Sequence, residues 1–572
     1  MHMKIKSILL AGLSLISMGM YTSCENMMDT TSNLVMFSKD NTLNQATDTV
    51  YSVMGIIGKM QAIADRTVLL GEIRGDLVEL TPQASVDLQE LAQFKVGTEN
   101  VYNSAESYYA VINNCNFYLA NVDTALKKRN EYVFMKEFAA VKTFRAWTYL
   151  QLATIYGSVP IITEPILTEA AANKVYPLYN IKQICNYFID DLTPYIETPT
   201  PGYGAINGLD SKKFFLPTRV VLGDLCLWGE RYLEAARFYH DYLTNITTQT
   251  NVVSTSLSQT IWNKDETTFS KMQNGYNYLF STIGNVEIVS YIPMETTASE
   301  KGFSGLSNVF NSTIQNNYFY QATPSRKLFE LSKAQSNCIV YSTNNKQDTL
   351  YAPTRNDVNP LWVGDLRLAS VYSTKSDGTT INDGNPTTSS LYSSARQTIS
   401  KLSTGHVLLY RRGQIYLRFA EAMNRAGFPE SAFAILKYGL YQSNIDKYVD
   451  PVERSRAGIL MYFSQYLFTP NNTLGIHSRG SGDAFANKNY VIPELPNQND
   501  SINYVEDLIC DETALETSFE GCRFFDLVRM ALHRDDNLWL AQKIAERNGP
   551  ANFDADLYKT VKERESWFLP LK

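Results

Sequence analysis

Apolar residues recur at helical spacing over long stretches of the chain. Between Met135 and Tyr156 they occupy almost every face of a helix, and Gly157 and Pro160 follow directly. An apolar surface on all sides indicates a buried helix, and a glycine followed by a proline is a typical helix end. The stretch from 103 to 125 predicts a second long helix. We therefore predict a mainly α-helical fold.

Two later segments share one pattern of small residues. Gly223 is followed twelve positions later by Ala235, and Ala420 is followed twelve positions later by Ala432. Small side chains at this spacing let two antiparallel helices approach closely, which is the pattern of tetratricopeptide repeats. The sequence therefore predicts tetratricopeptide-like helical pairs over about residues 103–243 and 410–445.

The middle of the chain lacks the helical pattern. Residues 244–400 are rich in Ser, Thr, Asn and Gly, with short β-like runs such as Val286 to Ile292. We predict a large loop-rich insertion within one domain, and we expect it to bind the ligand because loops on a rigid scaffold commonly carry function. Long surface loops without a binding role are the alternative.

The first residues of the chain have the pattern of an export signal. Two lysines precede an apolar run of 13 residues, from Ile8 to Met20, and small residues precede Cys24. The run is too short to cross a bilayer as a helix. We predict a lipoprotein signal peptide over residues 1–23 and lipid attachment at Cys24, with residues 24–572 as a single domain on the anchor. An ordinary signal peptide followed by a chance cysteine is the alternative.

Composition narrows the possible partners. Lys and Arg number 51 against 58 Asp and Glu, so the net charge of −7 argues against a nucleic-acid partner. The 36 tyrosines are too many to be buried in the core. They predict solvent-exposed surfaces that bind sugar-like or planar ligands.

Catalytic and metal-binding signatures are absent from the sequence. We find no HExxH, P-loop or nucleophile-elbow motif, no CxxC and no zinc spacing. The adjacent acids Asp190 and Asp191 could serve glycoside chemistry in principle, but solvated acids on a helix are the simpler interpretation. We therefore predict a non-enzymatic protein without metal or cofactor, whose remaining cysteines are buried free thiols.

The C-terminal region contains the run Phe519-Glu520-Gly521-Cys522-Arg523-Phe524-Phe525-Asp526-Leu527-x-Arg529. Its charged residues Glu520, Arg523, Asp526 and Arg529 are spaced three apart and alternate in sign. On one helix they would form a ladder of pairs, each worth about 0.3 to 0.5 kcal/mol if exposed. We interpret this ladder as a structural feature.

The same run resembles the SusD/RagB family of outer-membrane nutrient-binding lipoproteins. Three further blocks support the resemblance, and they occur in the same order as in the family. They are Tyr109-x2-Ile112-x3-Asn116, the stretch Arg145 to Pro160, and Tyr416-Leu417-Arg418-x2-Ala420-Glu421-Ala422.

The resemblance implies a SusD-like fold and a role in nutrient uptake. Such a protein would be lipid-anchored at the outer membrane, facing outward, as the lid of a SusC-like TonB-dependent transporter. It would capture a glycan, deliver it for import and cleave nothing. A peptide ligand, as for RagB-like members, and a tetratricopeptide scaffold that binds only proteins remain open.

Aromatic residues of the insertion are the candidate ligand contacts, because their rings can stack on the apolar faces of sugars or pack against peptide side chains. Packing inside a satellite core is the alternative for each ring. The candidates are Trp262, Tyr276, Tyr278, Tyr291 and Trp362.

Overall fold

The computed structural model describes most of the chain after residue 45. The described residues are 46–244, 262–264, 269–271, 276–297, 300, 302–311, 320–343, 346–351, 364–376, 379–381, 396–470 and 474–571. Cys24 and Trp362 lie outside them.

Helices dominate, which confirms the predicted mainly α-helical fold. The helices before the insertion are α3 (Ala46–Glu72), α4 (Val86–Ala92), α5 (Ala105–Asn121), α6 (Met135–Tyr156), α7 (Glu169–Ala172), α8 (Ile181–Leu192), α9 (Thr218–Trp228) and α10 (Tyr232–Thr244). Those after it are α15 (Arg412–Arg425), α16 (Pro429–Lys437), α17 (Gln442–Tyr448), α18 (Pro451–Ala457), α19 (Ser478–Ser481), α20 (Gln498–Thr517), α21 (Arg523–Arg534), α22 (Asn537–Ala545) and α23 (Ala555–Val561).

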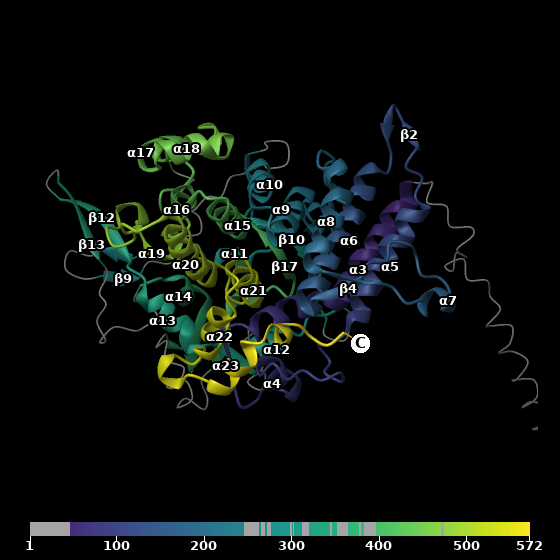
Figure 1. Cartoon of the computed structure of the whole chain (residues 1–572), viewed down its shortest axis with the longest axis horizontal. Coiled ribbons are helices and arrows are strands. Elements are labelled where there is room, and N and C mark those ends of the chain that lie inside the picture. The colour runs from purple at the N-terminus through teal and green to yellow at the C-terminus, as the bar shows by residue number, and fades with distance from the viewer. Residues whose placement is uncertain are drawn as a thin grey trace, which may run out of the picture.

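The long helices pack against one another in chain order. Each contacts the next along the series α3, α5, α6, α8, α9, α10, α15, and α15 then contacts both α16 and α20 (Figure 1). Contact between α21 and α3 brings the C-terminal helices back to the first one. The result is a curved helical scaffold that continues across the insertion, because α10 and α15 pack directly together.

The predicted close approach of α9 and α10 is present. A Cβ atom built on Gly223 would lie 2.5 Å from the ring of Tyr239, so only glycine fits there. Ala235, Ala420 and Ala432 are fully buried, as the pattern predicts.

Local signals set the helix ends. Helix α6 ends at Gly157, whose φ of 75° suits a residue without a side chain. Helix α8 begins with a capping box in which Asn180 and Gln183 exchange two hydrogen bonds of 3.0 Å. The end of α6 and the start of α8 are both set by residues adjacent to them in the chain. The sequence alone could therefore predict the end of α6.

The described parts of the insertion contain short helices and hairpins. The helices are α11 (Tyr278–Ser281), α12 (Leu306–Phe310), α13 (Arg326–Ala334) and α14 (Arg367–Val371). The strands are β8 (Trp262–Lys264), β9 (Phe269–Lys271), β10 (Ile288–Ile292), β11 (Ala322–Pro324), β12 (Cys338–Thr343), β13 (Lys346–Tyr351), β14 (Tyr372–Ser376), β15 (Thr379–Ile381) and β16 (Arg396–Ile399). The described parts of this region therefore contain regular elements, although these are short.

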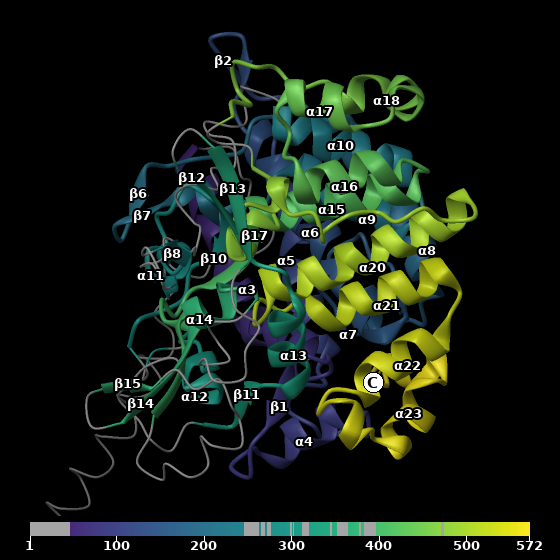
Figure 2. The same cartoon turned by 90° about the vertical axis from the view of Figure 1, so that its left-hand side faces the viewer.

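Strand pairing joins the insertion to the scaffold. Strand β10 pairs antiparallel with β17 (Val407–Arg411), which leads into α15. Strand β11 pairs antiparallel with β1 (Val78–Leu80), just after α3 (Figure 2). The remaining pairs outside the insertion are β2 (Lys127–Lys128) with β3 (Glu131–Tyr132), β4 (Ser158–Pro160) with β5 (Leu178–Asn180), and β6 (Ala205–Ile206) with β7 (Leu209–Asp210).

Candidate functional site

The C-terminal motif lies in the interior, where it contacts the first helix. The carboxylate of Glu72 accepts hydrogen bonds from the backbone N–H groups of Phe519 and Gly521, at 3.0 and 2.8 Å. A Cβ atom on Gly71 would lie 1.8 Å from the carbonyl oxygen of Gly521. The two backbones therefore meet at a spacing that only glycine permits.

The charged residues of the motif find their partners on distant elements. Arg523 binds Asp76 at 2.6 and 2.9 Å, and Arg529 binds Glu421 at 2.8 and 2.6 Å. Of the pairs expected within the ladder, only Asp526 with Arg529, at 2.8 Å, is found among the described residues. The predicted ladder along one helix is wrong, because α21 begins at Arg523 and leaves Glu520 outside it. Arg523, Asp526 and Arg529 are buried, so their pairs are interior contacts that link the motif to distant elements.

A buried cluster of charges connects α20 to the insertion. Glu516 of α20 pairs with Arg367 at 2.8 Å, with Arg479 at 2.9 Å, and with Arg411. Burial opposes ionisation of Glu516, but the three guanidinium groups outweigh it and hold the pKa of its carboxyl well below the usual range. Arg367 lies in α14 of the insertion, so this cluster ties the insertion to the scaffold.

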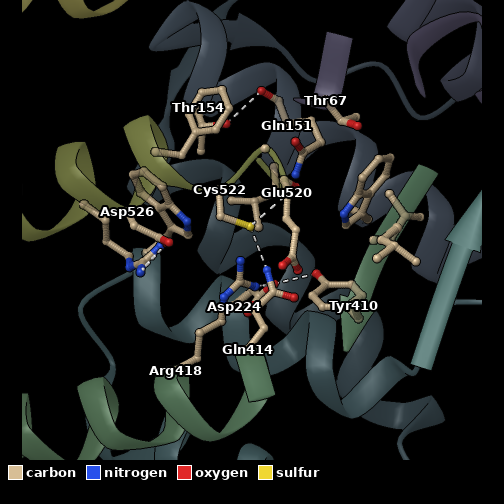
Figure 3. A pocket seen from close by; sticks show the side chains of 18 residues that line it. Thr67, Gln151, Thr154, Asp224, Tyr410, Gln414, Arg418, Glu520, Cys522 and Asp526 are labelled. Atoms are coloured by element: carbon tan, nitrogen blue, oxygen red, sulfur yellow. Dashed lines mark hydrogen bonds and ion pairs between the residues drawn. The ribbon is translucent and has the colours of Figure 1, made fainter. Parts of the chain in front are cut away.

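A small cavity lies behind the motif. Its volume is about 60 Å³, and Glu520 and Cys522 reach its wall from one side while Asp224, Gln414 and Arg418 reach it from the other (Figure 3). The Gln414 amide donates to the Cys522 sulfur at 2.8 Å, and Arg418 pairs with Asp224. A cavity of this size admits one or two waters and no sugar ring. We therefore assign it a structural role.

A much larger cavity opens where the scaffold meets the insertion. We call it the junction cavity; its volume is about 380 Å³, within the range of small-molecule sites. Its walls come from the start of α9, the end of α10, β10 and the turn before it, and the start of α15. The residues that line it are Ile196, Thr198, Pro199, Thr200, Asp210, Lys212, Lys213, Phe215, Pro217, Thr218, Arg219, Tyr242, Gly284, Val286, Ile288, Val289 and Arg412.

A third cavity, of about 270 Å³, lies beside α5. Its polar groups are already used within the fold: the amide of Asn113 exchanges two hydrogen bonds with the backbone of Ile166, at 3.1 and 2.6 Å. The Tyr109 hydroxyl likewise donates to the carbonyl oxygen of Pro160 at 2.9 Å. Because ligand sites orient their ligand with free polar groups, the junction cavity is the better candidate.

The C-terminal motif lies in a part of the chain that resembles known proteins. The model of the SusD family matches residues 329–572. This part of the chain is similar to the SusD family. No curated protein matches the sequence.

Solved structures of the SusD superfamily share the fold across most of the chain. A protein from Bacteroides thetaiotaomicron is 14% identical, covers 85% of this chain and 89% of its own, and gives a TM-score of 0.57. A protein from Bacteroides vulgatus is 14% identical, with coverages of 90% and 92% and a TM-score of 0.56. A SusD-like carbohydrate binding protein from Bacteroides fragilis is 13% identical, with coverages of 87% and 88% and a TM-score of 0.53. The predicted resemblance and fold class are therefore confirmed.

Two of the tyrosines proposed from the sequence lie in the core of this SusD-like chain. Tyr276 is fully buried, and its hydroxyl donates to the carbonyl oxygen of Glu516 at 2.8 Å. Tyr291, on β10, is 1% exposed and packs edge-on against Phe214. Neither ring reaches the surface in this conformation, so both residues have the packing role that was the stated alternative.

The other candidates have different positions. Tyr278 is 66% exposed at the start of α11 and is free to meet a ligand. The backbone of Trp262 lies in β8, paired with Lys271, but its side chain is outside the described part of the structure. Trp362 lies outside the described residues altogether.

Sequence reasoning missed the basic side chains of the junction cavity. Lys212-Lys213 and Arg411-Arg412 are adjacent basic pairs in a chain poor in charge, which is the one signal that could have pointed to them. Among the described residues, no three His, Cys, Asp or Glu side chains group as a metal site. In the same residues, no helix is long and apolar enough to cross a membrane.

Proposed function

We propose that this chain is a cell-surface nutrient-binding lipoprotein. It captures a glycan and delivers it to a SusC-like TonB-dependent transporter of the outer membrane, for which it acts as the lid. The anchor is a lipid on Cys24, and the ligand is bound and released without cleavage.

The junction cavity is the observation that carries this proposal. It joins a rigid helical wall to a wall built from β10 and its preceding turn, which is the arrangement expected of a binding site on a scaffold. Apolar residues such as Phe215 and Val289 line it beside polar groups such as Thr200 and Asp210, a mixture that suits an amphipathic ligand such as a sugar. The B. fragilis neighbour described as carbohydrate binding supports the same ligand class.

Aromatic residues of the insertion supply the second contact, and Tyr278 is the one among them whose side chain is described as exposed. Tyr278, together with Trp262 and Trp362, offers flat rings to sugar units that extend beyond the cavity. Each such ring contributes about 1 to 3 kcal/mol where it acts as a binding hot spot.

Calorimetric titration tests the ligand class. The protein is titrated with panels of oligosaccharides and of short peptides, and the products are analysed for cleavage. The proposal expects binding of at least one oligosaccharide with no turnover. Binding of peptides alone would replace the glycan by a peptide, and turnover of any ligand would overturn the non-enzymatic role.

Affinity purification from outer membranes tests the partner. The proposal expects a TonB-dependent barrel to co-purify with the protein, in an amount that changes when the oligosaccharide is added. Recovery of soluble proteins without a barrel would favour a protein scaffold instead.

A further inference from the structure

The junction cavity contains a buried cation, Arg412, for which no ion pair is found among the described residues. Arg412 is 6% exposed and lines the cavity at the first position of α15. Within the described residues, neither Nε nor Nη1 of its guanidinium has a hydrogen-bond partner. Burying a charged group without a partner costs free energy, so such a group is kept where something else pairs with it.

The carboxylate that acts on Arg412, Glu287, is bound elsewhere. Glu287, which acts on Arg412 electrostatically, binds Arg479 at 2.6 Å through Nη1 and also binds Arg411 at 3.1 Å. Burial lowers the pKa of Arg412, although Tyr242, Tyr416 and Glu287 act in the opposite direction. Within the described part of the chain, this charge therefore has no dedicated counter-ion.

The other basic residues of the cavity add to the positive charge. Lys213 donates to the carbonyl oxygens of Gly284 and Asn285, at 3.2 and 2.7 Å, so both of these hydrogen bonds go to neutral acceptors. Burial lowers its pKa; Asp210 opposes this shift, and the charge of Arg412 adds to it. Exposed Lys212 stands at the same wall.

Two further charges of the cavity do not cancel this excess. Arg219 is matched by Glu197 at 2.7 Å and by Asp241. The single acid of the lining, Asp210, is exposed and caps the short helix η2 (Ser211–Phe214) by accepting from the Lys212 N–H at 3.1 Å. An anion that enters the cavity would therefore meet a net positive wall.

We infer that the junction cavity binds a saccharide that carries an anionic group, carboxylate or sulfate, with Arg412 as the residue that pairs with that group. This rests on the proposed function and names its substrate class. The cavity of about 380 Å³ lies at the small end of ligand sites and holds a unit of one or two sugars. The rings of Phe215 and Tyr242 line the same space and offer apolar surface to a sugar face.

Titration with matched probes tests the inference. The probes are trigalacturonic acid, its methyl ester, a κ-carrageenan tetrasaccharide and its desulfated form, with trialanine and its C-terminal amide as peptide probes. At least one anionic saccharide should bind about tenfold or more tightly than its neutral form. Comparing the carboxylated probe with the sulfated probe shows which of the two anionic groups the cavity binds.

Two variants locate the binding group. Arg412→Gln should remove the preference for the anionic form and leave the melting temperature unchanged or raised, because no carboxylate among the described residues forms an ion pair with Arg412 and Glu287 keeps Arg411 and Arg479 as partners. Val286→Glu places an acid at a cavity residue that is 49% exposed, and it should remove the preference without disturbing the core. Val452→Glu, at a 68% exposed position on α18, is the matched control and should bind as the unchanged protein does.

The outcomes separate the inference from the proposed function. Equal affinity for anionic and neutral saccharides, or a preference that survives both cavity variants, would overturn the inference and leave glycan binding in place. A response to trialanine and to no saccharide would overturn it in favour of a peptide carboxylate. Absence of binding by every saccharide probe would overturn the inference and count against the glycan class as well.

Discussion

Arg523 of α21 donates two hydrogen bonds to the carboxylate of Asp76, at 2.6 and 2.9 Å, although the two residues are 447 positions apart in the chain. Both are buried, and despite that burial the charge of Arg523 holds the pKa of Asp76 below its usual value. The pair fixes the C-terminal motif, which lies in the part of the chain that is similar to the SusD family, to the segment that follows the first helix. A motif that is distinctive in sequence therefore has its role at a long-range contact.

Breaking this pair should strongly destabilise the protein. In the variant Arg523→Met the carboxylate of Asp76 stays buried without its cation, which costs about 3 to 5 kcal/mol of unfolding free energy. Urea unfolding measures it. The control is Lys182→Met, which removes an exposed 2.7 Å pair with Glu230 and should cost less than about 1 kcal/mol. Equal losses in the two variants would contradict the structural role of Arg523.

Gly223 should tolerate no side chain. The variant Gly223→Ala places a methyl group 2.5 Å from the Tyr239 ring, and the resulting overpacking costs about 1 to 3 kcal/mol. Gly58→Ala is the matched control, because Gly58 lies within α3 with open space at its Cβ position. That control should be neutral or stabilising, since alanine favours a helix more than glycine does. Thermal unfolding compares the two, and equal melting temperatures would reject the close helix contact.

Glu72 should make the protein less stable as the pH rises. Burial raises the pKa of its carboxyl from 4.5 to about 7, although hydrogen bonds from Phe519 and Gly521 oppose the shift. Between these two values the folded state binds more protons than the unfolded state. Stability from this group therefore falls as pH increases from 4.5 to about 7, by at most about 1.4 kcal/mol per pH unit.

Urea unfolding at several pH values between 5 and 8 measures this slope. Glu72→Gln has no titrating carboxyl at this position, so its unfolding free energy should fall less steeply across the same range. The comparison uses slopes, because the amide also alters the two hydrogen bonds and shifts the absolute stability. Parallel curves for the two proteins would show that Glu72 does not titrate in this window.

Tyr276 and Tyr278 should respond in opposite ways to substitution. Tyr276→Phe removes the buried hydrogen bond to the Glu516 carbonyl and should lower stability by about 1 kcal/mol without changing ligand affinity. Tyr278→Ala removes an exposed ring, so we expect an unchanged melting temperature and an affinity for oligosaccharide about tenfold weaker. Calorimetric titration and thermal unfolding of both variants test this. Full affinity in Tyr278→Ala would leave the stacking role to Trp262 and Trp362.

Cys24 should be required for membrane attachment. Replacing Cys24 with alanine removes the thiol that would carry the lipid, and the protein should move from the membrane fraction to the soluble fraction. Cell fractionation in a strain without the partner barrel measures this, because a bound partner could retain the protein. A variant that stays as firmly membrane-bound as the original would exclude lipid attachment at this residue.

Local features were the ones that sequence reasoning predicted well. The end of α6 at Gly157 and the close approach at Gly223 depend on residues within one helix or one helical pair, so spacing along the chain carries the information. The family resemblance of the C-terminal motif was confirmed for the same reason, since its residues are contiguous.

The candidate site was predicted less completely. Aromatic content suggested Tyr276 and Tyr291 as ligand contacts, but the exposure of a ring depends on which distant segments cover it. Both are covered by scaffold and C-terminal residues, whereas Tyr278 remains exposed. The junction cavity could not be found from spacing, because its walls come from segments as far apart in the chain as Ile196 and Arg412.

The sequence by itself determined that the chain is mainly helical, where small residues let helices approach, and which family the C-terminal part resembles. These properties follow from backbone propensity and side-chain periodicity, which act over a few turns. The tertiary structure alone decided that Arg523 pairs with Asp76 and that Arg412 lines a cavity, with two of its nitrogens unpaired among the described residues. Charge pairing and burial depend on which segments meet in space, and a buried guanidinium is matched or unmatched only once those segments are packed.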